Sequence, residues 1–142
     1  TVEFKPKAAV KFDGLKVATI SAGQHHAALL TQEGEVHTIG RGDTGQLGIE
    51  FGDGAPQETT LPVKVSGMDG TIISISTGST CTFAVNSAGK AYAWGFGENH
   101  QLGTPDDQDR GVPTLLCGQQ VDDRKIMNID SGGQHSCATA AD

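Results

Sequence analysis

The chain has 142 residues, a formal net charge of −7 and 20 glycines, and hydrophobic residues make up 36% of it. This length corresponds to one domain, and the glycine content is about twice the usual ~7%. The acidic balance argues against broad binding to DNA or to a membrane surface, because attraction to phosphate requires clustered Lys and Arg. No apolar run approaches the ~20 residues of a membrane span, and the three cysteines have no CxxC spacing. We therefore expect a soluble intracellular protein.

The first predicted element begins at residue 17, because residues 1–16 have no counterpart later in the chain. We interpret residues 1–16 as a lead-in segment or as the end of a preceding structural unit. Apolar runs and turn signals then predict four strands, over residues 17–21, 27–30, 36–39 and 62–65. Turns at Gly23 and Gly34 separate the first three, and a glycine-rich loop covers residues 40–48.

The same pattern returns after 55 residues, with strands predicted over residues 72–76, 82–85 and 91–94. The turn Ser21–His26 becomes Ser76–Cys81, and a third copy begins at Ser131. The spacing places Gly133 in the frame of Gly23 and Gly78. We interpret the recurring glycines as scaffold positions where the chain turns or two backbones approach closely; they are Gly23, Gly78, Gly133, Gly40, Gly95, Gly48 and Gly103.

Four short strands in each repeat are typical of a β-propeller blade, and no stretch has a helical period of useful length. We therefore predict an all-β fold of four-stranded blades. A blade has two apolar faces that its neighbours must cover. The pairs Ile39/Trp94 and Leu47/Leu102 are expected at the interfaces between blades. Residues 17–142 hold about two and a half repeats, too few to close a ring, so the chain is expected to be a fragment of a larger propeller.

Two stretches carry a more specific pattern: SAGQHHAALLTQEGEVHTIGRGDTGQLG at residues 21–48 and STGSTCTFAVNSAGKAYAWGFGENHQLGT at residues 76–104. Each has a small-residue turn before a strand, a glycine hairpin, an apolar-Gly-x-Gly stretch and then Gln-Leu-Gly. The chain resembles the regulator of chromosome condensation repeats. With SGGQHS at residues 131–136, it is most similar to the C-terminal blades of the chromatin-bound exchange factors for the small GTPase Ran. The resemblance implies a seven-bladed propeller that binds Ran on one face.

The resemblance also points to candidate site residues. In that family the first His of the matching GGQHH turn is implicated in nucleotide release, and His25 occupies this place here. We expect residues for GTPase binding or exchange at His25, His135 and Gln24, since turn residues at the end of a blade project towards partners. The alternative is that His25 only satisfies backbone groups of its turn, and Thr80 at the same place in the second repeat shows that the frame does not require His.

Other constellations favour structural roles. His26 aligns with Cys81 and Ser136 in the 55-residue frame and is interpreted as a strand-entry position. The stretch Gly40–Gly45 fits GxGxxG, but no helix is predicted behind it to face a dinucleotide. The five histidines and three cysteines have no zinc-site spacing, so neither a metal nor a cofactor is expected. The acidic loop with Asp106, Asp107 and Asp109 is either solvated or contacts basic residues of a partner.

The resemblance implies an exchange factor for Ran that forms no covalent bond and promotes GDP release and GTP loading. It also implies a nuclear, chromatin-associated protein that contacts histones or nucleosomes, and the remaining blades of the same protein would share the Ran contact. The fragment alone is expected to be inactive in exchange. One alternative is a protein-binding propeller without exchange activity, in a scaffold, a signalling protein or a ubiquitin ligase. A propeller hydrolase is a weaker alternative, because nothing marks an acid or base pair.

Overall fold

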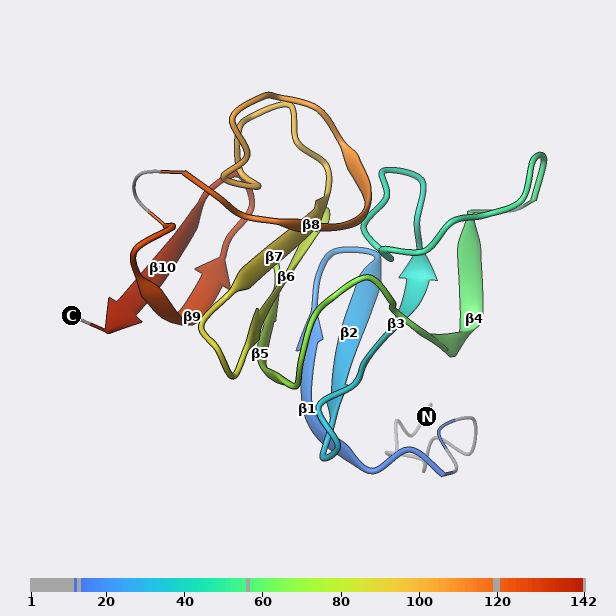
Figure 1. Cartoon of the computed structure of the whole chain (residues 1–142). Coiled ribbons are helices and arrows are strands. Elements are labelled where there is room, and N and C mark those ends of the chain that lie inside the picture. The colour runs from blue at the N-terminus through green and yellow to red at the C-terminus, as the bar shows by residue number, and fades with distance from the viewer. Residues whose placement is uncertain (1–11, 13, 56, 119–120, 142) are drawn as a thin grey trace, which may run out of the picture.

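The computed structural model describes residues 12, 14–55, 57–118 and 121–141. Within these ranges the chain forms ten β-strands and no α-helix, arranged in three antiparallel sheets (Figure 1). The first two sheets have four strands each in chain order, and the third pairs two strands. The strands are β1 (Val17–Ala22), β2 (His26–Thr31), β3 (Val36–Arg41), β4 (Glu58–Lys64), β5 (Ile72–Thr77), β6 (Cys81–Asn86), β7 (Ala91–Gly95), β8 (Arg110–Leu115), β9 (Lys125–Ser131) and β10 (Ser136–Ala141). The all-β prediction of four-stranded blades is confirmed.

The hairpins form where the glycine pattern predicts them. Gly34 between β2 and β3 and Gly89 between β6 and β7 both adopt positive φ, +80° and +84°, which a residue with a side chain adopts only with strain. The fourth strand begins four residues earlier than predicted, at Glu58 instead of residue 62. Its register pairs Arg41 with Glu58, so a polar stretch that the sequence predicts as loop extends the ladder.

The sheets pack face to face, as expected for blades. One buried apolar cluster joins the first and second sheets, and another joins the second and third. Leu47, Leu102 and Trp94 are fully buried, which confirms the predicted core positions. Ile39 is only half-buried, because it lies on the first sheet at the end of the row, where the described chain has no further sheet to cover it. Its place at an interface between blades therefore stays a prediction.

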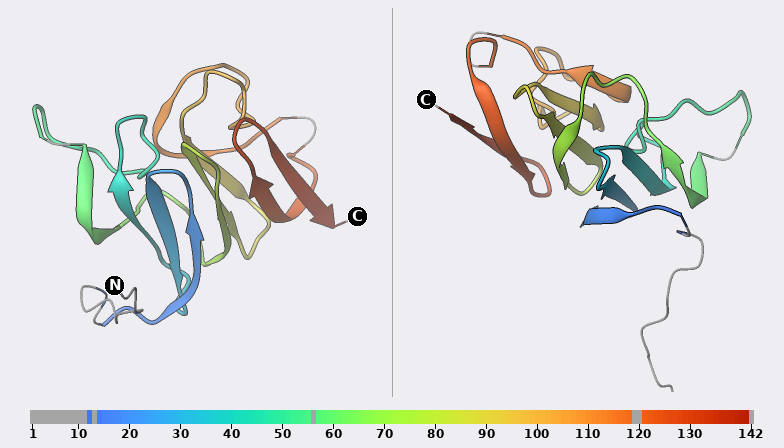
Figure 2. Two further views of the ribbon diagram at one scale, coloured as in Figure 1. Left: turned by 180° about the vertical axis from the view of Figure 1, so that it is seen from behind. Right: turned by 60° about the horizontal axis from the view of Figure 1, so that its bottom comes forward.

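The first strands of the three sheets lie side by side, with β1 against β5 and β5 against β9 (Figure 2). Polar side chains link them: the Ser74 hydroxyl donates to Asn128 Oδ1 at 2.6 Å, and the Thr77 amide donates to Ser21 Oγ at 3.0 Å. The fourth strands lie at the outer edges. This is the arrangement of neighbouring propeller blades around an axis, and the chain is a partial propeller.

The third repeat lies one residue away from its predicted frame. The amides of Gly23 and Gly78 donate to the carbonyls of His26 and Cys81 at 2.9 Å, and in the third sheet the same bond joins Gly132 to His135. Gly132, not Gly133, is therefore the counterpart of Gly78, at an offset of 54. The connection from the second to the third sheet is one residue shorter than a strict 55-residue repeat requires. The pair Gly132-Gly133 hides this shift in the sequence.

Candidate functional site

The turns between the first and second strand of each sheet form a hydrogen-bonded row. The Gln24 amide donates to the Ser79 carbonyl at 3.1 Å, and the Ser79 amide donates to the Gly132 carbonyl at 3.3 Å. A Cβ on Gly23 would lie 2.4 Å from the Gly78 carbonyl oxygen, closer than real contacts allow. Glycine is therefore required because backbones of neighbouring blades touch, as predicted for Gly23 and Gly78.

His25 has a fixed backbone and an exposed side chain. Its carbonyl accepts from the Arg41 amide at 2.9 Å, and a Cβ on Gly40 would lie 2.4 Å from the same oxygen. The second repeat repeats this geometry, with Gly95 against the Thr80 carbonyl. The scaffold thus holds the main chain of the turn whatever residue stands there, and the His25 side chain is exposed to solvent.

A shallow groove of about 590 Å³ runs along the turn row between the second and third sheets. Gln24 and His135, both exposed, lie at opposite ends of the row and line this groove. The structure thus brings two of the three predicted site residues to one groove, and His25 is not among its lining residues. The remaining lining residues are mostly polar: Ser79, Thr80, Phe96, Asn99, Gln101, Gly133 and Gln134.

His135 does not occupy the position that the sequence frame gives it. In the 54-residue frame its counterparts are Cys81 and His26, and the counterpart of His25 is Gln134. The His135 ring lies 2.9 Å from the place of a Cβ on Gly132, as the His26 ring lies 2.5 Å from that of Gly23. His25 and His135, which the 55-residue frame makes equivalent, therefore occupy different positions in their turns.

His26 is a residue whose importance the sequence did not reveal. It is 5% exposed, and its Nε2 lies 2.9 Å from Thr82 Oγ1 of the second sheet. The Thr82 hydroxyl donates its single hydrogen to the Gln46 carbonyl at 2.9 Å, so it accepts from His26 Nε2–H. Burial, opposed by the Cys81 main chain and assisted by His25, lowers the His26 pKa from 6.5 to about 4. The ring is therefore neutral at pH 7.

The Gln-Leu-Gly loop of the first repeat completes this junction. The Gln46 carbonyl accepts from Thr82 Oγ1 and also from Trp94 Nε1, at 3.0 Å. Gly48, with φ +67°, lies so close to the Trp94 indole that a Cβ would come within 2.7 Å of Nε1. The Gln46 side chain, itself buried, holds the loop by accepting from the Thr44 amide at 2.9 Å. The Gln-Leu-Gly motif that marks the repeat in the sequence thus binds side chains of the next blade.

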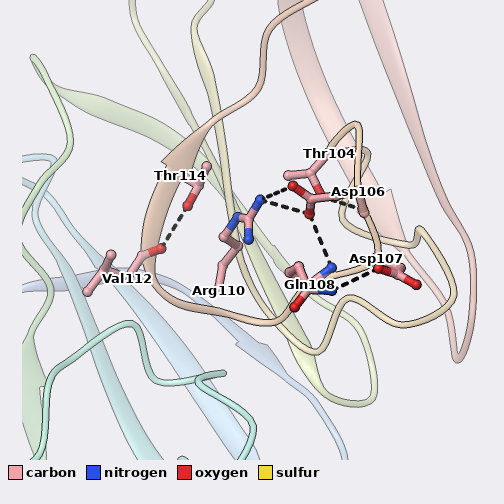
Figure 3. Close-up of polar contacts among 7 residues, drawn as sticks. All are labelled: Thr104, Asp106, Asp107, Gln108, Arg110, Val112 and Thr114. Carbon is pink, nitrogen blue, oxygen red and sulfur yellow. Dashed lines mark hydrogen bonds and ion pairs between the residues drawn. The ribbon is translucent and has the colours of Figure 1, made fainter.

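The acidic loop is held mainly by internal contacts (Figure 3). Asp106 makes two bonds to Arg110 Nη2, at 2.8 and 2.7 Å, and the Gln108 amide and Arg110 lower the pKa of its carboxyl. Asp109 Oδ1 accepts from the Gly97 amide at 2.8 Å, and Asp107 Oδ1 accepts from Gln108 Nε2 at 2.9 Å. All three carboxylates are exposed. A contact to a basic partner stays a prediction.

The described ranges also bear on a metal site, a dinucleotide site and a membrane span. They contain no group of three or more His, Cys, Asp or Glu residues that could hold a metal ion. Gly45, the last glycine of the GxGxxG stretch, is followed by a turn at residues 46–47 and then β4, and no helix lies behind it in the part of the chain that the structure describes. Within these residues no helix is long and apolar enough to cross a membrane.

Comparison with known proteins defines the class to which these blades belong. Residues 33–85 and 88–139 match the family described as "Regulator of chromosome condensation (RCC1) repeat", and residues 17–46 match a second model with the same description. The chain belongs to the RCC1 repeat family.

Individual relatives agree with this assignment. The human regulator of chromosome condensation is 36% identical over 122 residues, which cover 86% of this chain and 28% of that protein. The Saccharomyces cerevisiae guanine nucleotide exchange factor SRM1 is 33% identical over 144 residues, 93% of this chain and 30% of the relative. The Arabidopsis thaliana ultraviolet-B receptor UVR8 is 34% identical over 138 residues, which cover 96% of this chain and 30% of that protein. The chain thus spans about a third or less of the length of these relatives.

Solved structures give the same fold. The crystal structure of Prp20p from Saccharomyces cerevisiae, described with its binding properties to Gsp1p and histones, superposes with a TM-score of 0.82 at 31% identity. The match covers 91% of this chain and 32% of Prp20p. The three sheets therefore correspond to part of a larger RCC1-type propeller.

Proposed function

We propose that the chain is part of a guanine-nucleotide exchange factor for a small GTPase of the Ran type, which promotes GDP release and GTP loading on chromatin in the nucleus. A curated relative and a solved structure support this assignment: the relative is called a guanine nucleotide exchange factor, and the structure is described with its binding to Gsp1p and histones. A histone or nucleosome contact of the whole protein follows from the same relatives.

The observation that carries the proposal is the exposed pair Gln24 and His25 on a turn whose backbone is fixed on both sides. The Gln24 amide is held by the neighbouring turn and the His25 carbonyl by β3. Since the scaffold accepts Thr80 at the place of His25, an exposed imidazole there is available for a partner. An imidazole offers a hydrogen-bond donor and, in its neutral form, also an acceptor, and Gln24 adds an amide beside it.

Exchange by such a surface requires no covalent chemistry. The factor binds the nucleotide-free GTPase more tightly than the loaded one, so by linkage it weakens nucleotide binding. A 10⁴-fold weakening corresponds to about 5.5 kcal/mol of differential contact. One imidazole supplies a fraction of this, because a hydrogen bond contributes about 0.5–1.5 kcal/mol. Turns of further blades must share the contact, and we expect this chain by itself not to catalyse exchange.

The alternative is a protein-binding propeller without exchange activity. The relative UVR8 favours it, because a receptor in the same family has an identity to this chain similar to that of the exchange factor SRM1. In that case the groove along the turn row would bind a protein partner other than a GTPase.

The test is release of labelled GDP from Ran by the full-length protein and by its His25→Ala variant. The expected result is strong acceleration by the wild type and a loss of about ten-fold or less in the variant, the range of one hydrogen bond. Absence of acceleration by the wild type would refute the exchange function and favour the alternative. Normal release by the variant would refute only the role of His25.

A further inference from the structure

His26 is the member of the turn row whose side chain reaches from one blade into the next. Its Nε2–H donates to Thr82 Oγ1 in β6, which in turn donates to the Gln46 carbonyl. The chain of bonds therefore runs from the first sheet to the second and back to the first. Because the ring is buried, the bond has no competition from solvent and holds the two blades at a fixed distance.

The ring also supports the turn from beneath. A Cβ on Gly23 would lie 2.5 Å from His26 Cε1 and 2.7 Å from Nδ1, so the ring packs directly against the backbone that precedes Gln24. Within the described residues Nδ1 is buried without a hydrogen-bond partner. The bond to Thr82 is thus the side-chain hydrogen bond that orients the ring.

The second repeat shows that this bond is an addition to the scaffold. In the second sheet Cys81 takes the place of His26, and its Sγ lies 3.6 Å from Ser131 Oγ. In the third sheet His135 takes it, and the described chain has no further sheet that could supply a counterpart of Thr82. The blade therefore folds with a small residue at this position. The fold of a blade does not by itself require the buried imidazole of His26.

We propose that His26 is a positioning residue for nucleotide exchange: its bond to Thr82 fixes the turn that presents Gln24 and His25 to the GTPase. This inference rests on the proposed function and deepens it. The adjacent exposed His25 meets the partner, and the buried His26 sets where the turn lies.

The experiment compares three variants of the full-length protein in GDP release from Ran. His26→Cys installs the residue found at the same place in the second sheet, so the blade should fold. We expect an about ten-fold slower release, the effect of one hydrogen bond. His26→Gln keeps an N–H donor near the Nε2 position and should restore most of the rate. His37→Cys, a matched control, removes another buried imidazole, one on β3 with no bond to the second sheet, and should release GDP at the wild-type rate.

The pH profile separates positioning from simple stability. A protonated His26 would place a charge in a buried site, so the turn should loosen as the ring gains a proton. Two neighbouring groups act on the His26 pKa: the Cys81 main chain on β6 raises it, and His25 in the same turn lowers it. We expect exchange by the wild type to fall more steeply than exchange by His26→Gln, whose side chain does not titrate, as the pH approaches 4. Parallel profiles would overturn the proposal.

A second measurement does not depend on nucleotide exchange by the protein. Hydrogen exchange of the Gln24 amide, which donates to the Ser79 carbonyl, reports the position of the turn directly. Its protection should fall in His26→Cys and persist in His26→Gln and His37→Cys. Unchanged protection in His26→Cys would refute the positioning role. If the wild type releases no GDP from Ran, the proposed function fails, and the Gln24 amide still decides whether His26 positions the turn.

Discussion

The junction between the first and second sheets and the junction between the second and third are built from the same repeat but are not equally complete. At the first, the Gln46 carbonyl accepts from both Thr82 and Trp94. At the second, the equivalent Gln101 carbonyl accepts from Ser136 Oγ at 2.9 Å. The third sheet has two strands in the described chain, so no counterpart of Trp94 reaches this loop.

Gly48 and Gly103, the glycines of the two loops, differ in the same way, because only Gly48 has an indole beside it. Gly48 lies against the Trp94 indole, whereas the nearest neighbours of a Cβ on Gly103 would be the Leu116 methyl groups at 3.9 and 4.0 Å. Both glycines adopt positive φ, +67° and +73°, so the turn itself requires glycine at each. The comparison shows that a loop of one blade is completed by the second and third strands of the next.

Removal of Trp94 is expected to have the largest effect on this comparison. Trp94→Ala should lower the free energy of unfolding by about 3–5 kcal/mol, because it deletes a fully buried aromatic residue and its bond to Gln46. Urea denaturation measures the loss. The control is Ile39→Ala, at the equivalent place on the half-covered end face, which should cost clearly less. Equal losses would show that the junction contributes nothing beyond the burial within each sheet.

Acid should weaken the first junction through His26. The folded chain lowers the His26 pKa from 6.5 to about 4, so between these pH values the unfolded chain binds more protons. The contribution is complete above pH 6.5 and is lost progressively as the pH falls towards 4. The loss approaches about 3 kcal/mol, since one pKa unit corresponds to about 1.4 kcal/mol.

Urea denaturation at a series of pH values measures this effect, with His26→Gln as the control that lacks a titrating ring. The wild-type stability should fall relative to the variant as the pH is lowered through this range. A constant difference between the two proteins from pH 7 to pH 4 would contradict the assignment of a neutral, buried His26.

The frame of the third repeat can be tested with two glycines that the sequence makes equivalent. Gly78→Ala should cost about 2 kcal/mol, because its Cβ would lie 2.8 Å from the Gly132 carbonyl oxygen and 2.6 Å from Ser131 Oγ. Gly133→Ala should change stability by less than about 0.5 kcal/mol, because its Cβ would meet only Ser79 Oγ at 3.7 Å. Thermal unfolding of both variants provides the measurement. Similar losses of stability in the two variants would support the 55-residue frame instead of the 54-residue offset.

The accuracy of the sequence-based predictions differed between local and non-local features. The strands, the hairpins at Gly34 and Gly89 and the close approaches at Gly40 and Gly95 were predictable, because alternating burial and backbone clashes leave a direct mark on residue type. The early start of β4 was not, since its residues 58–61 are polar or exposed and pair only because β3 offers them an edge. The site residues follow the same division: Gln24 and His25 were identified as turn residues, but the burial of His26 depends on a strand 56 positions away.

The sequence by itself determined the repeat, the four strands of each blade and the glycines at which backbones touch, because each of these is a local requirement that a single residue type satisfies. Only the tertiary structure decided the register of the third repeat, since the two neighbouring glycines at 132 and 133 fit either frame until a hydrogen-bond partner selects one. It also decided the different roles of His25 and His26. One is exposed and the other is buried because the neighbouring blade supplies Thr82, and the residues of the turn carry no sign of that contact.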